Sequence, residues 1–212
     1  MLLSSLLFSG LVTAAPISML DEGSHCVAYK ARKTMFLVSS DDVVGKNCEI
    51  SAQVLPDVGG VYHIEVNIPV KKFESGNGTR DEDVAKTLKE DVRAELTFRS
   101  KGLSVEAWRE LFAKGDFELP GELQIGDKSF PLKVKSKYTT KDDQAEVDGI
   151  AQVKFSDFEI DTPRAGGGLV AKAKPEFELH FHLLGSRILG ADSIRPVAEK
   201  KDADKEKEKE KK

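Results

Sequence analysis

Apolar and polar residues alternate with a period of two through most of the chain. In the run from 62 to 68, the even-numbered positions are apolar and the odd-numbered positions are polar. The same alternation recurs at 95–99, 117–125, 130–138, 146–155 and 177–183. Successive side chains of a strand point to opposite faces, so each of these segments has one apolar and one polar face. The pattern predicts antiparallel strands with one face in water.

Weaker strand patterns lie in the N-terminal third, at 26–29, 34–39 and 43–55. Glycine-containing turn sequences separate the segments, among them Val58-Gly-Gly60 and Gly126-Asp-Lys128. About eight or nine strands with short connections are typical of a closed barrel or a sandwich. Closure would also remove the unpaired edges that so many strands create. We therefore expect a mainly β, antiparallel barrel.

Two short helices are expected between the strands. Residues 81–90 carry an apolar stripe, and Asp81 can cap the start of that helix. Residues 104–113 carry a second stripe behind the capping residue Ser104. Trp108 belongs to this second stripe, so we expect it to pack beneath the helix.

The two ends differ from the body of the chain. Residues 1–14 are a short apolar run with small residues before Ala14, which is typical of a secretory signal cleaved after that residue, although no basic residue lies near Met1. A buried N-terminal helix or strand is the alternative. Residues 199–212 are almost wholly Lys, Glu and Asp and cannot bury an apolar face, so they are predicted to form a solvated, disordered tail. The folded domain is expected at 22–196, in a protein exported to the periplasm or the extracellular space.

Charge and aromatic content narrow the function. The net charge is −4, and basic residues alternate with acidic ones, so nothing indicates a nucleic-acid partner. Eleven of the fifteen aromatic residues are Phe, which adds apolar bulk without a polar atom. Such an interior suits either a dry core or an apolar pocket.

The chain has two cysteines, Cys26 and Cys48. In an exported protein an even pair can form a disulfide. The alternative is two free, buried thiols that act as small hydrophobic residues. Neither a Cys-x-x-Cys redox pair nor a metal site is indicated.

No catalytic or metal-binding constellation is evident in the sequence. A Gly-x-Ser-x-Gly elbow and a phosphate-binding loop are both missing. His180, His182 and Glu178 share one strand face, opposite to Phe177 and Phe181. This face should be the outer, wet side of a barrel, where a functional metal would lack enclosure. We predict a protein that is not an enzyme and that has neither a resident metal nor a cofactor.

One motif carries a family resemblance. Ser75-Gly-Asn77-Gly-Thr-Arg80-Asp81 follows an amphipathic strand, precedes a helix, and is followed by Glu95-Leu-Thr-Phe98. Together with Gly121–Ile125 and Phe155–Ile160, this order resembles the YceI-like family of periplasmic, lipocalin-like proteins that bind polyisoprenoids. The resemblance covers residues 61–184.

The resemblance implies an eight-stranded lipocalin-like barrel that carries or stores a long apolar lipid, either a polyisoprenoid or an isoprenoid quinone. A membrane would then serve only as lipid donor or acceptor, and a homodimer stays open because relatives are often dimers. Within the motif, Ser75, Gly76, Asn77, Arg80 and Asp81 are expected to shape the turn and the helix start; holding a ligand head group is the alternative. The residues expected to line the apolar tunnel are Ile64, Val66, Ile68, Phe73, Phe98, Leu123, Ile125, Phe130, Leu132, Val134, Ala151, Phe155, Phe158, Phe177 and Phe181.

Small residues at strand positions that point into the barrel support a tunnel. Gly121, Gly149 and Ala151 occupy little space, so we expect them to leave room for a slender ligand in a barrel of this size. The competing hypothesis is a filled barrel that acts as a stress-response or interaction module through its surface and its charged tail.

Overall fold

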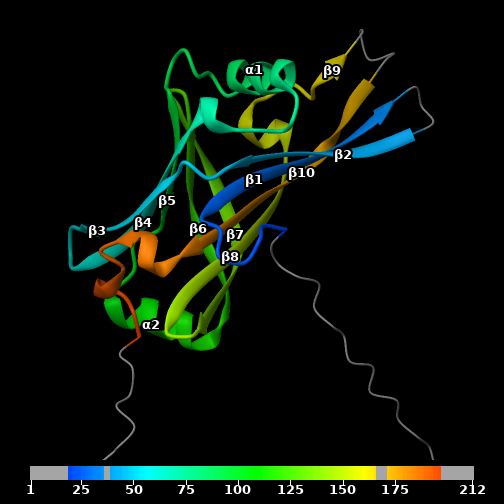
Figure 1. Cartoon of the computed structure of the whole chain (residues 1–212). Helices are drawn as coiled ribbons and strands as arrows, with labels where there is room; N and C mark the ends of the chain where they lie inside the picture. The colour runs from blue at the N-terminus through cyan, green and yellow to red at the C-terminus, as the bar shows by residue number, and fades with distance from the viewer. Residues whose placement is uncertain (1–18, 36–38, 166–170, 197–212) are drawn as a thin grey trace, which may run out of the picture.

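The computed structural model describes residues 19–35, 39–165 and 171–196 (Figure 1). The predicted signal segment at 1–14 and the charged tail at 199–212 lie outside the described residues. No helix within the described ranges is long and apolar enough to cross a bilayer.

Strands dominate the described part of the chain. They are β1 (Cys26–Met35), β2 (Ser39–Asn47), β3 (Ser51–Asp57), β4 (Val61–Pro69), β5 (Glu95–Ser100), β6 (Asp116–Ile125), β7 (Lys128–Lys141), β8 (Gln144–Lys154), β9 (Arg164–Ala165), β10 (Ala171–Leu184) and β11 (Ile188–Leu189). The helices are α1 (Gly78–Thr87) and α2 (Val105–Lys114), with short 3-10 turns η1 (Val70–Lys72), η2 (Phe155–Phe158), η4 (Gly185–Arg187) and η5 (Ala191–Ser193).

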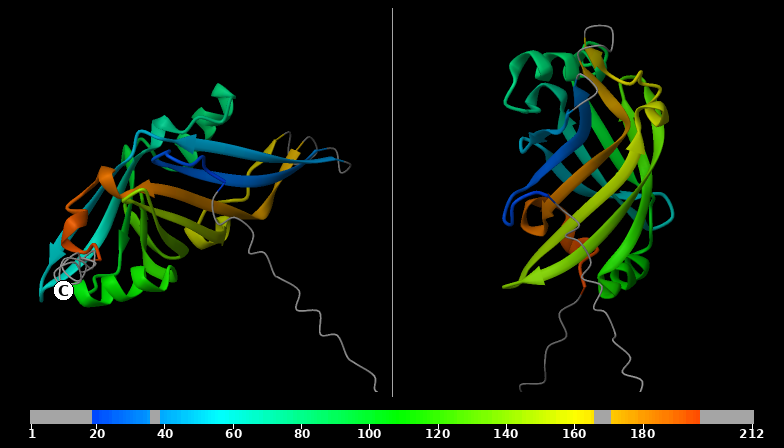
Figure 2. Two further views of the ribbon diagram at one scale, coloured as in Figure 1. Left: turned by 60° about the horizontal axis from the view of Figure 1, so that its bottom comes forward. Right: turned by 90° about the vertical axis from the view of Figure 1, so that its right-hand side faces the viewer.

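The strands form a single curled sheet in the order β11-β3-β4-β5-β6-β7-β8-β10-β1-β2, with β9 paired to β10. All ladders are antiparallel except that between β11 and β3. Figure 2 shows the curl, while in Figure 1 the far ends of β1, β2 and β10 project as an arm. No ladder within the described ranges joins β2 to β3, so the sheet is a half-barrel.

The mainly antiparallel β prediction is confirmed, but the count of eight strands is not, since the described sheet has eleven. Two of these, β9 and β11, are only two residues long and too short for an alternating pattern. In the N-terminal third, the predicted segments at 34–39 and 43–55 are instead parts of three strands.

The concave face of the sheet holds the core. Its buried side chains include Ile64, Val66, Phe98, Leu132 and Val134, which are the inward positions of the alternating segments. Burial of a large aliphatic or aromatic side chain is worth about 1.5–3 kcal/mol. The alternation therefore selects which face of each strand turns inward.

Helix α2 closes one end of the half-barrel. Ser104 caps it by accepting a hydrogen bond from the Ala107 amide, as predicted. Trp108 is completely buried, and its indole Nε1 donates to the Tyr62 carbonyl at 2.9 Å. Phe112 stacks between Trp108 and Tyr138, so this end is filled with aromatic rings.

Helix α1 lies at the opposite end (Figure 2). The prediction placed its cap at Asp81, but the helix begins earlier, at Gly78, and its cap is Asn77. The Asn77 side chain accepts a hydrogen bond from the Arg80 amide at 3.0 Å. Asp81 is thereby released for a different contact, described below.

The predicted wet face of β10 is buried where β1 begins. His180 and His182 are 6% and 2% exposed and bond to the carboxylates of Glu178 and Asp148. These histidines pair across the ladder with Ala28 and Cys26, which form a second buried cluster with Leu20. The expectation of an outer, solvated His-x-His face was therefore wrong, because the segment before β1 packs on it.

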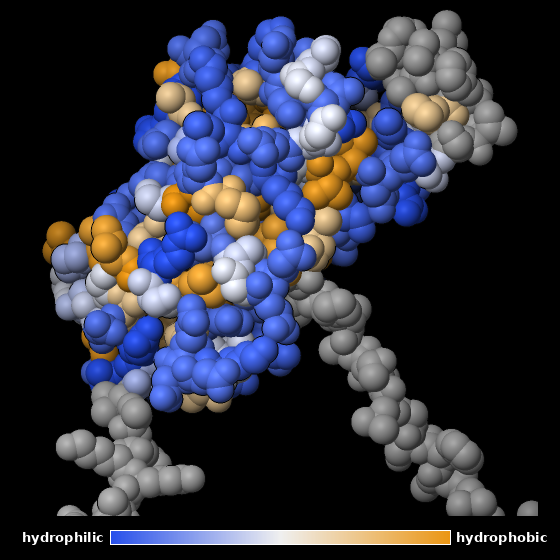
Figure 3. All heavy atoms as spheres, in the orientation of Figure 1, coloured by the Kyte–Doolittle hydropathy of each residue, from blue (hydrophilic) through white to orange (hydrophobic). Residues whose placement is uncertain are grey.

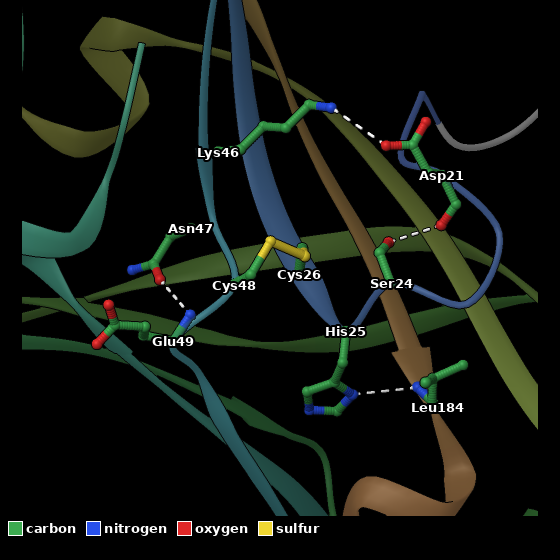
Figure 4. The surroundings of a disulfide bond; sticks show 9 residues. All are labelled: Asp21, Ser24, His25, Cys26, Lys46, Asn47, Cys48, Glu49 and Leu184. Carbon is green, nitrogen blue, oxygen red and sulfur yellow. Dashed lines mark hydrogen bonds and ion pairs between the residues drawn. A yellow bond between two sulfur atoms is a disulfide. The ribbon is translucent and has the colours of Figure 1, made fainter. Parts of the chain in front are cut away.

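Cys26 and Cys48 form a disulfide, the first of the two predicted alternatives (Figure 4). Cys48 follows the last residue of β2, and Cys26 is the first residue of β1. The bond fastens β1 to the segment in which the chain crosses from β2 to β3.

Candidate functional site

An apolar cavity of about 340 Å³ opens at the α1 end of the half-barrel. Its walls come from the arm strands β1 and β10, from β5 and β6, from η2 and from α1. Hydrophobic atoms are visible at the base of the projecting arm in the space-filling view (Figure 3). The two ends of the half-barrel therefore differ, since aromatic rings fill the α2 end.

The fifteen residues expected to line a tunnel fall into two groups. Six of them line the cavity: Phe73, Leu123, Ile125, Phe155, Phe158 and Phe177. The others lie within or against the packed core: Ile64, Val66, Ile68, Phe98, Phe130, Leu132, Val134, Ala151 and Phe181. The cavity thus occupies one end of the interior rather than its whole length.

The inward glycines do not leave the room expected of them. A Cβ on Gly149 would overlap the ring of Phe181, its direct cross-strand partner. A Cβ on Gly121 would lie 2.7 Å from the ring of Phe98. The space beside Gly149 is taken by an aromatic ring, and that beside Gly121 by the Phe98 ring together with the Arg99 carbonyl. Packing of an aromatic ring over a glycine is known to stabilise glycines in sheets.

The sequence missed the lining residues from α1 and the arm. Val84 and Leu88 of α1 line the cavity, as do Ala31, Ala173 and Leu179 of β1 and β10. Val84 and Leu88 were recognised as an apolar stripe, but a stripe alone does not tell what the helix covers. This apolar stripe was the one feature of the sequence from which a helix covering the mouth of the barrel could have been predicted.

The motif residues form a polar network where the chain enters α1. Asp81 accepts hydrogen bonds from the Ser75 amide, at 3.1 Å, and from the Ser75 hydroxyl. Arg80 donates to the Ser75 hydroxyl at 2.7 Å and to its carbonyl at 2.8 Å. Gly76 has a positive φ of 76°, which the turn requires. These contacts agree with the structural interpretation of the motif, because they fix the turn that places α1.

Tyr29 connects this network with the cavity. Its ring packs on Phe73, with centroids 5.6 Å apart, and occupies the space beside Gly45. Its hydroxyl is buried, and the Ser75 side chain lies close enough to act on it as a hydrogen-bond partner. Burial raises the pKa of this hydroxyl, so it stays protonated and able to donate. Tyr29 therefore joins the cavity wall to the polar network around Ser75.

Basic side chains predominate at the cavity rim. Arg32, Lys33, Arg164 and Lys172 lie there, and Asp83 is the acidic residue among the lining residues. Arg32 is paired with Asp42 at 2.9 Å. The mouth is consequently polar and cationic around an apolar interior.

Catalytic chemistry would need a nucleophile and a base within hydrogen-bond reach. The cavity walls are built of apolar side chains, with charged groups at the rim. Within the described ranges, no group of three or more His, Cys, Asp or Glu side chains is placed to hold a metal ion. The geometry fits the enclosure of an apolar chain.

A family model described as a YceI-like domain matches residues 19–184. A search of curated proteins gave no match. Among the solved structures that share the fold are the following two. BcnA from Burkholderia cenocepacia is 19% identical with a TM-score of 0.53, and the match covers 74% of this chain and 95% of that one. A polyisoprenoid-binding domain from Saccharophagus degradans, implicated in plant cell wall breakdown, is 11% identical with a TM-score of 0.54, covering 74% and 92%.

Proposed function

Because this chain belongs to the YceI-like family, we propose that it binds the apolar chain of an isoprenoid lipid or quinone in the cavity beneath α1. It carries or stores that lipid without catalysis. The observation that supports this most directly is the apolar cavity itself, open at the α1 end of the half-barrel. A barrel filled throughout would favour the interaction-module hypothesis instead.

The energetics of burial favour such a ligand. Each methylene-sized group that leaves water for an apolar site contributes about 0.8 kcal/mol. The cavity of about 340 Å³ is lined mainly by apolar side chains, so each methylene-sized group that it encloses gains in this way. The gross gain grows with the number of groups buried, and the cost of ordering the ligand is subtracted from it.

The arrangement also gives the ligand an orientation. The tail occupies the apolar interior, and the head group lies at the rim near the basic side chains of Lys33, Arg164 and Lys172. The buried hydroxyl of Tyr29, beside Ser75, adds a polar group to the same cavity wall. The similar Saccharophagus degradans domain is described as polyisoprenoid-binding, which supports the same ligand class.

We place this activity in an exported protein that exchanges lipid with a membrane. The disulfide between Cys26 and Cys48 supports this, because disulfides persist mainly in oxidising compartments outside the cytosol. The apolar run at 1–14 supports export as well.

Native mass spectrometry of the full chain purified from its own source tests the proposal. We expect a bound prenyl lipid or quinone, and rebinding of the extracted lipid after delipidation. Val84→Trp places a larger side chain in the cavity wall and should abolish the bound mass. Val92→Trp is the matched control, since Val92 is 58% exposed and lies outside the cavity lining. A strictly unliganded mass with no uptake in either the native or the delipidated protein would refute the proposal.

A further inference from the structure

The arm carries an excess of basic side chains. Its described residues lie at 30–35, 39–44 and 171–175, together with the paired strand β9 at 164–165. Within these ranges six residues are basic and two are acidic. The basic ones are Lys30, Arg32, Lys33, Arg164, Lys172 and Lys174. The net charge of the whole chain is −4, so the arm is opposite in sign to the molecule that carries it.

Most of the basic charge on the arm is not neutralised. Asp42 pairs with Lys30 at 3.4 Å and with Arg32 at 2.9 Å. The other acidic residue, Asp41, lies opposite Lys33 in the ladder between β1 and β2. Four basic side chains form no ion pair within the described ranges: Lys33, Arg164, Lys172 and Lys174. The arm therefore presents free positive charge to solvent.

Two of these free charges face each other. Arg164 of β9 lies directly opposite Lys172 of β10 in the ladder, and both residues are exposed. Like charges directly opposite each other destabilise a sheet. An anionic surface beside the arm would relieve this repulsion.

The free charges lie at the mouth of the apolar cavity. Lys33, Arg164 and Lys172 are among the residues that line it. Helix α1, on the other side of the mouth, has three acidic and two basic residues and so offers no positive excess. In Figure 1 the arm projects beyond the body of the half-barrel, which leaves its basic side chains free to approach a flat surface.

We propose that the arm docks this protein on an anionic phospholipid membrane, with the mouth of the cavity turned toward the bilayer. The inference rests on the proposed function, because it identifies the surface through which lipid is exchanged. The same membrane repels the negative charge carried elsewhere on the chain, so the attraction of the arm also orients the molecule. The apolar ligand then passes between bilayer and cavity with little exposure to water.

Co-sedimentation of the full chain with vesicles tests the docking surface. Vesicles of phosphatidylcholine alone are compared with vesicles of phosphatidylcholine and phosphatidylglycerol. Each basic residue near an anionic bilayer strengthens binding by roughly fivefold. The wild type should prefer the mixed vesicles, and added salt should release it because the attraction is screened. The combined variant Arg164→Gln, Lys172→Gln and Lys174→Gln should bind the mixed vesicles roughly 100-fold more weakly.

The matched control removes three positive charges from another surface. Lys133, Lys135 and Lys137 form an exposed row on β7, and the last two lie opposite Glu118 and Asp116 of β6. Changing all three lysines to Gln gives the same net charge as the arm variant but should leave vesicle binding nearly unchanged. Equal losses in the two variants would overturn the proposal, because net charge and not the arm would then control binding. Thermal unfolding confirms that both variants are folded.

The remaining outcomes separate docking from lipid binding. Equal binding of the wild type to both kinds of vesicle, or wild-type binding by the arm variant, would overturn the docking surface. A wild type that carries prenyl lipid in native mass spectrometry but does not sediment with anionic vesicles would refute docking and leave the proposed function intact. A wild type that sediments with them but takes up no prenyl lipid would instead count against the proposed function.

Discussion

At the scale of single residues, the burial of the histidines is the main feature that the sequence did not predict. All four are buried. His25 is 2% exposed, and its Nδ1 accepts a hydrogen bond from the Leu184 amide at 3.1 Å. Burial, aided by the nearby charges of Arg187 and His182, lowers the pKa of His25 to about 4. The folded state therefore holds this imidazole neutral.

The low pKa of His25 predicts a loss of stability in mild acid. The unfolded chain binds a proton at this site below a pH of about 6.5, whereas the folded chain binds it only near 4. Stability is thus fully present above the unfolded pKa and declines as the pH falls through this window. Between pH 7 and pH 5 the free energy of unfolding should fall by roughly 2 kcal/mol from this residue. Urea unfolding at the two pH values measures it.

His25→Asn is the control for this prediction. The amide oxygen can still accept from the Leu184 amide, but the side chain does not titrate. The variant should lose less stability than the wild type over the same interval. A residual loss is expected, since burial also lowers the pKa of His63. Identical pH profiles for variant and wild type would contradict the assignment to His25.

The residue scale also shows where sequence reasoning failed. The alternation correctly predicted that Gly121 and Gly149 face the interior. The inference that they leave room there holds only if each strand is considered by itself. The rings that fill this room belong to Phe98 and Phe181 on neighbouring strands. The contact depends on register, which a single sequence does not supply. The burial of His180 and His182 was mispredicted for a similar reason. Which segment packs on the outer face of a strand depends on the tertiary structure, not on the strand's own pattern.

At the scale of elements, α1 is positioned by its entry turn rather than by its own helical propensity. The helix has ten residues, and one of them, Ala85, is buried. Helices this short are marginal without tertiary support. The bonds from Ser75 to Asp81, with Arg80 donating back to Ser75, supply that support and hold the helix over the cavity.

Asp81→Ala should therefore destabilise the protein. It leaves the Ser75 amide and hydroxyl without their acceptor, and an unsatisfied group of this kind costs about 1–3 kcal/mol. Glu82→Ala is the matched control, because Glu82 is an exposed acid in the same helix and should change stability by less than about 0.5 kcal/mol. Thermal unfolding of both variants measures the difference. Equal effects would mean that the charge near the helix start matters and the network does not.

The long strands and both helices were predictable because the apolar residues in each recur with the period of that type of secondary structure. The length of α1 was not, since Asn77 and Asp81 are both good capping residues and the choice between them depends on Ser75. The cavity walls were predicted in part: residues of η2, of the end of β6 and Phe177 of β10 were among the predicted positions, whereas α1 and β1 were not. Those missing walls come together only when the sheet curls.

At the scale of the whole molecule, the half-barrel must be held together between β2 and β3, which no described ladder joins. We call this place the seam. The chain leaves β2 at one edge and enters β3 near the other. Asn47, the last residue of β2, is 1% exposed, and its Nδ2 donates to the Pro69 carbonyl at the end of β4 at 2.8 Å. Lys46 exchanges two backbone hydrogen bonds with Glu74 beside it. The disulfide between Cys26 and Cys48 fastens the same place covalently (Figure 4).

Reduction of this disulfide should weaken the whole fold. The bond closes a loop with a sequence separation of 22, and removing it returns chain entropy to the unfolded state. A loop of this size corresponds to about 3 kcal/mol in the chain-entropy model. Guanidinium unfolding should show the midpoint falling on addition of dithiothreitol, with a somewhat steeper slope because the reduced unfolded chain is less compact. The double variant Cys26→Ala with Cys48→Ala should start from the lowered midpoint and not respond to the reductant. An unchanged midpoint in the reduced wild type would mean that Asn47 and the Lys46–Glu74 bridge hold the seam without the covalent bond.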